Sequence, residues 1–152
     1  MIKLNLGSGY RQLHGYVNID NREEVHPDVL ADITVGLKYE DSSVDEVRAY
    51  DILEHIPIGK TVALIEEIYR VLIPGGRFEH FTPSTDGRGA FQDPDHKSFW
   101  NINSWLYFMD DQHRDLYGIK AKFGGNNRDE ITNPRMRIIH THGVLYAVKE
   151  GK

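Results

Sequence analysis

The sequence predicts an α/β fold with an open, mostly parallel sheet that carries an antiparallel hairpin strand at its C-terminal edge. In the first half of the chain, short β-rich runs end at glycine or aspartate, as strands leading into loops do. A segment with helical apolar spacing lies between two later strands, as a parallel crossover requires. Near the end of the chain, a polar run precedes another apolar stretch, which is typical of a hairpin.

Four strands are predicted in the first half, at residues 2–6, 16–19, 28–33 and 44–50. The passage from Gly9 to Asp20 is too short for a strand and a helix of ordinary length, about 11–12 residues. We therefore expect the first helix of the fold to be shortened or absent.

The clearest helix spans residues 61–72, because apolar side chains recur there at helical spacing. The Pro-Gly-Gly sequence at 74–76 ends it and leads into a fifth strand at 77–82. A short helix is also expected at residues 51–54, whose capping-box spacing has an acidic residue in place of Ser or Thr. Pro57 would interrupt that short helix.

The last third begins with a long irregular loop, residues 83–103, whose aromatic content favours a functional loop over a disordered one. A helix is expected from Asn103 to about residue 115. Residues 136–149 are expected to form one long strand after a polar loop at 124–134, with residues 119–123 available to pair with it.

Composition narrows the function classes. The 152 residues are 39% hydrophobic and 27% charged, which fits a single globular domain spanning residues 1–152. The net charge of −5 disfavours general nucleic-acid binding. No cysteine is present, so disulfides and a cysteine nucleophile are excluded. No apolar stretch approaches the roughly 18–20 residues of a membrane span, and we expect a cytoplasmic protein.

The loops after the parallel strands predict a ligand site, because ligands of open α/β sheets bind beyond the carboxyl ends of the strands. Gly7 and Gly9 let the backbone turn sharply and approach a ligand closely. A carboxylate at Asp20 is placed to accept hydrogen bonds from two ribose hydroxyls. Asp32 could accept one from an exocyclic amine such as that of adenine.

A dinucleotide is a poor candidate for this ligand. Its fingerprint requires a third small residue three positions after the second glycine, and a full helix whose N-terminus binds the pyrophosphate. Here Gln12 holds that position and the helix is truncated. A ligand without phosphates fits better, and a dinucleotide or nucleotide-sugar enzyme is the less favoured reading.

Five elements in order carry a family resemblance, namely LNLGSG, the NID strand end, the ADI step, YDILEHI and RVLIPGGRF. Through them the chain resembles class I S-adenosylmethionine-dependent methyltransferases, especially the small type-11-like branch. The resemblance runs from residue 3 to 84 and extends through DPDHKSFWNINSW and the C-terminal hairpin. It implies a Rossmann-like methyltransferase sheet, S-adenosyl-L-methionine as cofactor and S-adenosyl-L-homocysteine as product. The implied reaction moves a methyl group to an O or N atom of a small-molecule or saccharide-type acceptor. The alternative is a non-catalytic S-adenosylmethionine-binding module or partner subunit.

The resemblance also implies site residues. Those expected to bind the cofactor are Asn5, Gly7, Ser8, Gly9, Asp20, Asn21, Asp32, Ile33, Asp51 and His55. Asn5 stands where the wider superfamily commonly has an acid, and Ser8 where the branch often has cysteine. His55 and His96 are the candidate catalytic bases, since histidine titrates near neutral pH.

Structural roles compete with several of these functions. The aspartates could cap turns, and a backbone-bonding role for His55 is as well supported as a catalytic one. No metal site is expected. Metal binding is disfavoured both for the set Asp93, Asp95 and His96 and for the pair of histidines at 140 and 142. Neither membrane nor general nucleic-acid partners are expected. The aromatic residues expected near the cofactor's sulfonium are Tyr10, Phe91 and Trp100.

Overall fold

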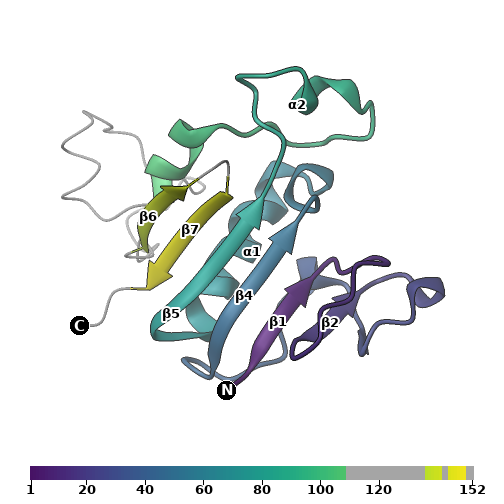
Figure 1. The fold of residues 1–152 in the computed structure, drawn as a ribbon, viewed down its shortest axis with the longest axis vertical. Coiled ribbons are helices and arrows are strands. Elements are labelled where there is room, and N and C mark those ends of the chain that lie inside the picture. The colour runs from purple at the N-terminus through teal and green to yellow at the C-terminus, as the bar shows by residue number, and fades with distance from the viewer. Residues whose placement is uncertain (109–135, 142–143, 150–152) are drawn as a thin grey trace.

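The computed structural model describes residues 1–108, 136–141 and 144–149, in which the strands form a single sheet (Figure 1). The order across the sheet is β3-β2-β1-β4-β5-β7-β6. The strands are β1 (Lys3–Leu6), β2 (Val17–Asp20), β3 (Val29–Leu30), β4 (Val44–Tyr50), β5 (Leu72–Phe81), β6 (Met136–Thr141) and β7 (Val144–Lys149). Strands β1 to β5 pair in parallel, whereas β7 is antiparallel to both β5 and β6. The α/β class and the mostly parallel sheet are confirmed.

Helices are few in the described part of the chain. The α-helices are α1 (Ile58–Val71) and α2 (Gly89–Gln92), and the 3-10 helices are η1 (Glu23–Val25), η2 (Ile33–Val35), η3 (Leu53–His55) and η4 (Ile102–Phe108). No helix lies between β1 and β2, as the sequence predicts. Side chains hold that connection instead: Asn5 donates to the carbonyl of Arg11 at 3.1 Å, and Asn18 accepts from the Leu13 amide at 2.8 Å.

The hydrophobic core lies on one face of the sheet, where α1 packs behind β4 and β5 (Figure 1). Alternation along the strands points Leu4, Val47 and Phe78 to this face, and all three are fully buried. Trp105 of η4 extends the core by packing on Phe78, with ring centroids 6.1 Å apart.

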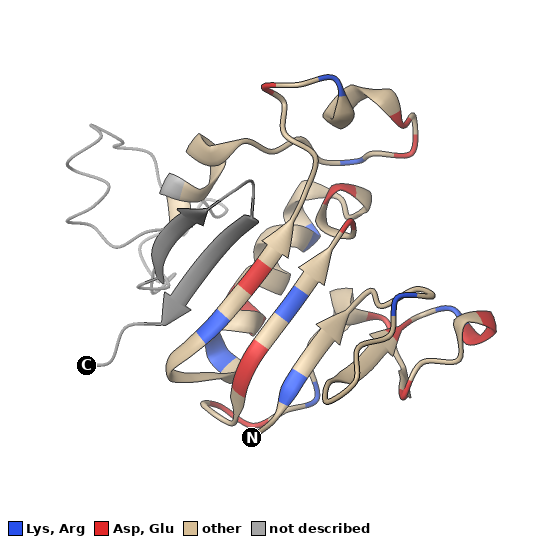
Figure 2. Cartoon of the chain, viewed as in Figure 1, with Lys and Arg blue, Asp and Glu red and all other residues tan. Residues whose placement is uncertain are grey.

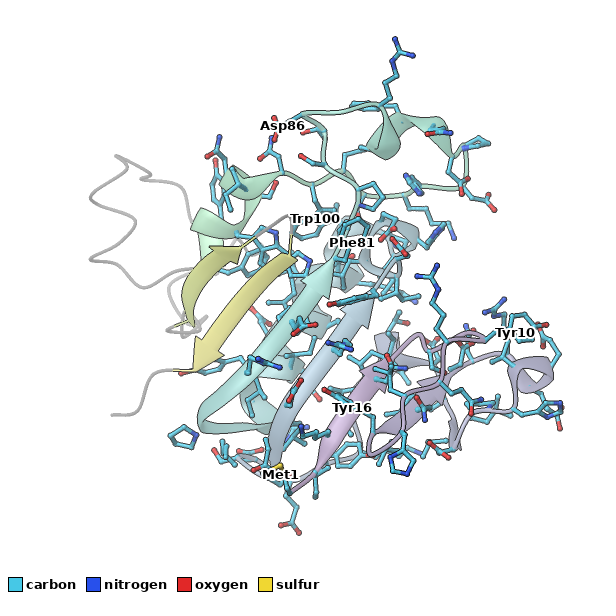
Figure 3. All side chains as sticks on the ribbon, in the orientation of Figure 1. Met1, Tyr10, Tyr16, Phe81, Asp86 and Trp100 are labelled. Atoms are coloured by element: carbon cyan, nitrogen blue, oxygen red, sulfur yellow. The ribbon has the colours of Figure 1, made fainter. Side chains whose placement is uncertain are left out.

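The opposite face carries charged side chains, with one lysine on β1 and charges that alternate in sign along β4 and β5 (Figure 2). Glu46 accepts from Lys3 at 3.1 Å, from Arg77 at 2.9 Å and from the Tyr16 hydroxyl. In Figure 3, Tyr16 and other side chains stand on this face of the sheet, and no described helix lies in front of it. Burial opposes ionisation of Glu46, but hydrogen bonds from these three partners outweigh it and lower the pKa to about 2.

Three predicted boundaries in the first 108 residues are wrong. Strand β3 is only two residues long, because Asp32 caps η2 directly after it. Helix α1 begins at Ile58, one turn before the predicted start, with Pro57 at its N-cap position. Strand β5 begins at Leu72 and runs through the Pro-Gly-Gly sequence with a shift in register against β4.

The expected capping box after β4 is also wrong. The segment forms only the 3-10 turn η3, whose N-cap residue is Ile52 and whose first amides receive no side-chain hydrogen bond. At the C-terminal edge, the single strand expected at 136–149 is two antiparallel strands, β6 and β7. Of the helix expected at 103–115, the structure describes residues up to 108 as part of η4. The expectations for residues 119–123 and 124–134 lie outside the described residues.

Among the described residues, none of the helices has the length and apolar character needed to cross a membrane.

Candidate functional site

A cavity of about 700 Å³ opens at the carboxyl ends of β1, β2 and β4. The strand order reverses between β1 and β4, so the cavity lies at the switch point of the sheet. Seven of the ten residues predicted to bind the cofactor line it, namely Gly7, Asp20, Asn21, Asp32, Ile33, Asp51 and His55. The other three, Asn5, Ser8 and Gly9, are not among the residues that line this cavity.

Gly7 brings bare backbone to the cavity wall. It has a φ of +62°, and a Cβ added there would lie 2.5 Å from Cγ1 of Ile52. Asp51, directly before Ile52, follows the end of β4 and has a φ of +50°, which is an uncommon conformation for a residue with a side chain. Both strand ends on either side of the switch point are therefore bent sharply at the cavity.

Asp20 links the glycine loop to the end of β2. One of its carboxylate oxygens accepts from the Gly9 amide at 2.8 Å, and the other accepts from the backbone amide of Arg22 at 3.0 Å. The Arg22 guanidinium also lies 3.3 Å from this carboxylate. Each oxygen retains acceptor capacity because a carboxylate has about four lone-pair sites.

Asp32 combines a structural role with a place on the cavity wall. Its carboxylate caps η2 by accepting from the Thr34 amide at 2.8 Å, and hydrogen bonding to Thr34 lowers the pKa of Asp32. The turn-capping alternative considered for this residue is thus present in the structure. Ile33, which follows it, is buried and contributes an apolar surface.

Two histidines meet at the end of the cavity nearest η3. His55 lines the cavity, and its ring lies edge-on to that of His96, with centroids 5.0 Å apart. His96 comes from the long loop after β5, where its Nδ1 lies 2.8 Å from the Ala90 carbonyl oxygen. The structure brings together the two candidate bases, which are 41 residues apart in the sequence.

Glu54 joins this pair and was not singled out by the sequence. Its side chain is buried, and its Oε2 has no hydrogen-bond partner among the described residues. Burial raises the pKa of Glu54 to about 7, with a smaller contribution from the charge of Asp51, while His96 acts in the opposite direction. The sequence signal that could have indicated Glu54 as a site residue is its position directly before His55.

The long loop is fixed over this corner by backbone and hydroxyl contacts. The amides of Lys97 and Ser98 both donate to the Glu54 carbonyl, at 2.7 and 3.0 Å. The Ser98 hydroxyl donates to the Leu53 carbonyl at 2.9 Å and receives the indole N–H of Trp100 at 2.8 Å. The loop that covers Glu54 is thus tied to the backbone carbonyls of Leu53 and of Glu54 itself.

The aromatic residues expected near the cofactor are placed differently. Trp100 is buried and packs against Trp105 with ring centroids 5.1 Å apart, so it belongs to the core. Tyr10 and Phe91 are exposed and do not line the cavity.

Comparisons with known proteins agree with this geometry. A family model described as a methyltransferase domain matches residues 12–79. A SAM-dependent methyltransferase from Archaeoglobus fulgidus aligns with a TM-score of 0.65 at 16% identity, over 97% of this chain and 85% of the other. A chain from the complex of the Haloferax volcanii Trm112 methyltransferase activator with a methyltransferase has a TM-score of 0.61 at 15% identity, over 99% and 82%. A chain from the DhpI-SAM-HEP complex has a TM-score of 0.56 at 18% identity, over 96% and 76%.

A comparison with curated proteins gave no match. The shared fold confirms the predicted Rossmann-like sheet, and the family model, which matches residues 12–79, supports the predicted resemblance to class I S-adenosylmethionine-dependent methyltransferases. S-adenosyl-L-methionine is the cofactor of this class.

Proposed function

We propose that this chain transfers a methyl group from S-adenosyl-L-methionine to an O or N atom of a small-molecule or saccharide-type acceptor. The observation that carries the proposal is the cavity at the switch point of the sheet, where Gly7, Asp20, Asp32 and His55 converge. As part of the same proposal, residues 1–152 form one domain, and the protein acts in the cytoplasm. Fractionation of expressing cells tests this location. The single sheet supports the one-domain assignment.

The residues present fit the cofactor. A cavity of about 700 Å³ is within the usual range for small-molecule sites, about 300–1,000 Å³. Gly7 lines the cavity without a side chain, and a Cβ there would overlap Ile52. Asp20 and Asp32 offer carboxylate oxygens to hydroxyl and amine donors, and Ile33 offers an apolar surface to a planar ring.

In the proposed assignment, Asp20 holds the ribose, while Asp32 and Ile33 face the adenine. Asn21 completes that side of the site, and Gly7 lies under the cofactor beside Ser8 and Gly9. Asp51 and His55 border the methionine end. Asn5 acts through the loop that it ties to β1, because its amide donates to the carbonyl of Arg11.

When bound, S-adenosyl-L-methionine supplies an electrophilic methyl group on a sulfonium sulfur and leaves as S-adenosyl-L-homocysteine. The work of the protein is then mainly alignment of the acceptor, which can contribute up to about 7–11 kcal/mol in favourable cases. In this proposal His55, which lines the cavity, takes up the proton of the acceptor. His96, whose ring lies against that of His55, is the second candidate base.

Two measurements test the proposal. Calorimetry should detect binding of S-adenosyl-L-methionine and of its demethylated product, but not of NAD. Transfer of radiolabelled methyl to a panel of hydroxyl and amine acceptors then separates an enzyme from a non-catalytic binding module. Absence of affinity for both cofactor forms would contradict the proposal.

The His55→Ala variant tests the catalytic assignment. We expect turnover to fall by about 10²–10⁴-fold, the usual contribution of an acid–base group, with cofactor affinity retained. The exposed His14 provides the matched control, because His14→Ala removes an imidazole that does not line the cavity. Unchanged turnover in His55→Ala would remove His55 from the mechanism.

A further inference from the structure

We propose that Glu54, His55 and His96 form a binding site for a divalent transition-metal ion of the zinc type. One possible ligand atom from each of the three residues lies within 4.8 Å of the other two. Two imidazole nitrogens and a carboxylate oxygen form a ligand set that suits zinc and its neighbours, whereas magnesium and calcium prefer oxygen ligands. Of its three residues, His55 is the one that lines the cavity.

Glu54 gives the strongest structural reason for a cation. The residue is 2% exposed, and its Oε2 has no hydrogen-bond partner among the described residues. A buried carboxylate without a partner is costly, and native proteins compensate such groups by pairing or by metal coordination. The two imidazoles beside Glu54 are neutral ligands of the kind that would complete such a site.

His96 is already oriented as a metal ligand would be. Its Nδ1 faces the Ala90 carbonyl oxygen at 2.8 Å, and a carbonyl can only accept, so the ring proton is on Nδ1. In a neutral ring of this tautomer, the lone pair is on Nε2. Metal-binding histidines commonly donate the other ring N–H to a backbone carbonyl in this way, which fixes tautomer and ring orientation. The Asp93 carboxylate, 4.0 Å from Nε2, is a further oxygen within reach.

The position of the site connects it with the proposed methyl transfer. Because His55 lines the cavity, a cation beside it could bind a hydroxyl of the acceptor and lower the pKa of that hydroxyl. The two imidazoles would then hold the cation, and the proton of the acceptor hydroxyl would pass to water. The cation would thus replace a free imidazole in making the acceptor nucleophilic. This step rests on the proposed function and narrows the acceptor to an oxygen nucleophile.

Metal uptake by the full chain tests the site directly. Metal-free protein is dialysed against ZnCl₂ and the bound zinc is measured, with Co²⁺ absorption as a second readout of the ligand geometry. We expect one equivalent of zinc in the wild type. In Glu54→Gln and in His96→Gln the affinity should fall by about 100-fold or more, because changes beyond the direct ligands already cost about 10–100-fold.

The control is His14→Gln, which alters an exposed histidine outside the cluster and should keep full uptake. Circular dichroism verifies the fold of each variant. If Glu54→Gln fails to fold, the His55→Gln variant takes its place, with loss of the zinc-dependent rise in Tm as readout. No uptake by the wild type, or equal uptake by folded Glu54→Gln, would overturn the proposal.

The outcome is distinguishable from failure of the proposed function. Zinc uptake by a chain with no affinity for S-adenosyl-L-methionine would leave the metal site standing and remove the methyltransferase proposal. Binding of S-adenosyl-L-methionine by a chain that takes up no zinc would remove the metal site and leave the methyltransferase proposal standing.

Discussion

Gly7 is under two constraints, and a pair of glycine variants can separate them. A positive φ costs an L-residue about 1–2 kcal/mol, and both Gly7 (φ +62°) and Gly15 (φ +82°) have one. Only at Gly7 would a Cβ also overlap Ile52, at 2.5 Å, whereas at Gly15 nothing lies within 4 Å. We expect Gly15→Ala to lower the free energy of unfolding by about 1–2 kcal/mol. Gly7→Ala should lower it by a further 1–3 kcal/mol or so, the usual cost of overpacking.

Urea unfolding of both variants measures the difference. A similar loss in the two would show that Ile52 moves aside without cost. The close contact at Gly7 would then explain nothing about the choice of glycine in this loop.

Asp20 is the residue whose proposed contact with the cofactor can be tested most simply. Asp20→Asn keeps the shape of the side chain but removes its charge and one acceptor. We expect the affinity for S-adenosyl-L-methionine to fall by about 1–3 kcal/mol, roughly 5- to 150-fold in Kd, as for other charged hydrogen bonds. Calorimetry measures this change, and Asp41→Asn is the control because Asp41 is exposed and pairs with Arg70. An unchanged Kd in folded Asp20→Asn would exclude the ribose assignment.

At the scale of elements, the sequence predicts what depends on local pattern. Strand β4 matches its predicted bounds, and α1 is found where apolar residues recur at helical spacing. Its earlier start was missed because Pro57 suggested an interruption, whereas proline is tolerated at the beginning of a helix, where its missing N–H is not needed. The prediction of a capping box failed because Asp51 instead adopts a left-handed backbone conformation at the cavity.

The site was predictable where it depends on strand ends and hidden where it depends on the long loop. Gly7 follows β1, Asp20 ends β2 and Asp32 comes two residues after β3, so the topology of a parallel sheet brings them together. The burial of Glu54 depends on the loop that contributes His96, and no local pattern specifies where a 20-residue loop docks. The core position of Trp100 was missed for the same reason.

The start of α1 also offers a test of element stability. Gly59 lies in the first turn of α1, has no unusual φ, and a Cβ added there meets nothing within 4 Å. We expect Gly59→Ala to raise the free energy of unfolding by about 0.5–1 kcal/mol, because glycine loses more backbone entropy in a helix than alanine does. Thermal unfolding measures the gain. A decrease would mean that the first turn of α1 is not helical in solution.

For the molecule as a whole, the two faces of the sheet depend differently on pH. The core face is apolar apart from a few buried groups. On the opposite face, Glu46 lies between Lys3 and Arg77, and Glu79 pairs with Arg48. Side chains of this kind cover sheet area with their aliphatic stems while their charges pair. The charged face should therefore lose a stabilising contribution in acid, in addition to the loss expected at the core face from the buried His80, whose pKa burial lowers to about 3.

Glu46 makes this expectation quantitative. Its pKa falls from an ordinary value of 4.5 to about 2 in the folded chain, so the native state favours the ionised form. The resulting stabilisation is present above the unfolded pKa and is lost as the pH falls through the folded one; at neutral pH it is about 3 kcal/mol. The free energy of unfolding of the wild type should therefore decline between about pH 5 and pH 2. In Glu46→Gln, which has no carboxyl group to titrate at this position, the decline should be smaller by about that amount. Urea unfolding across this pH range measures both curves, and parallel curves would show that the network around Glu46 does not stabilise the fold through its charge.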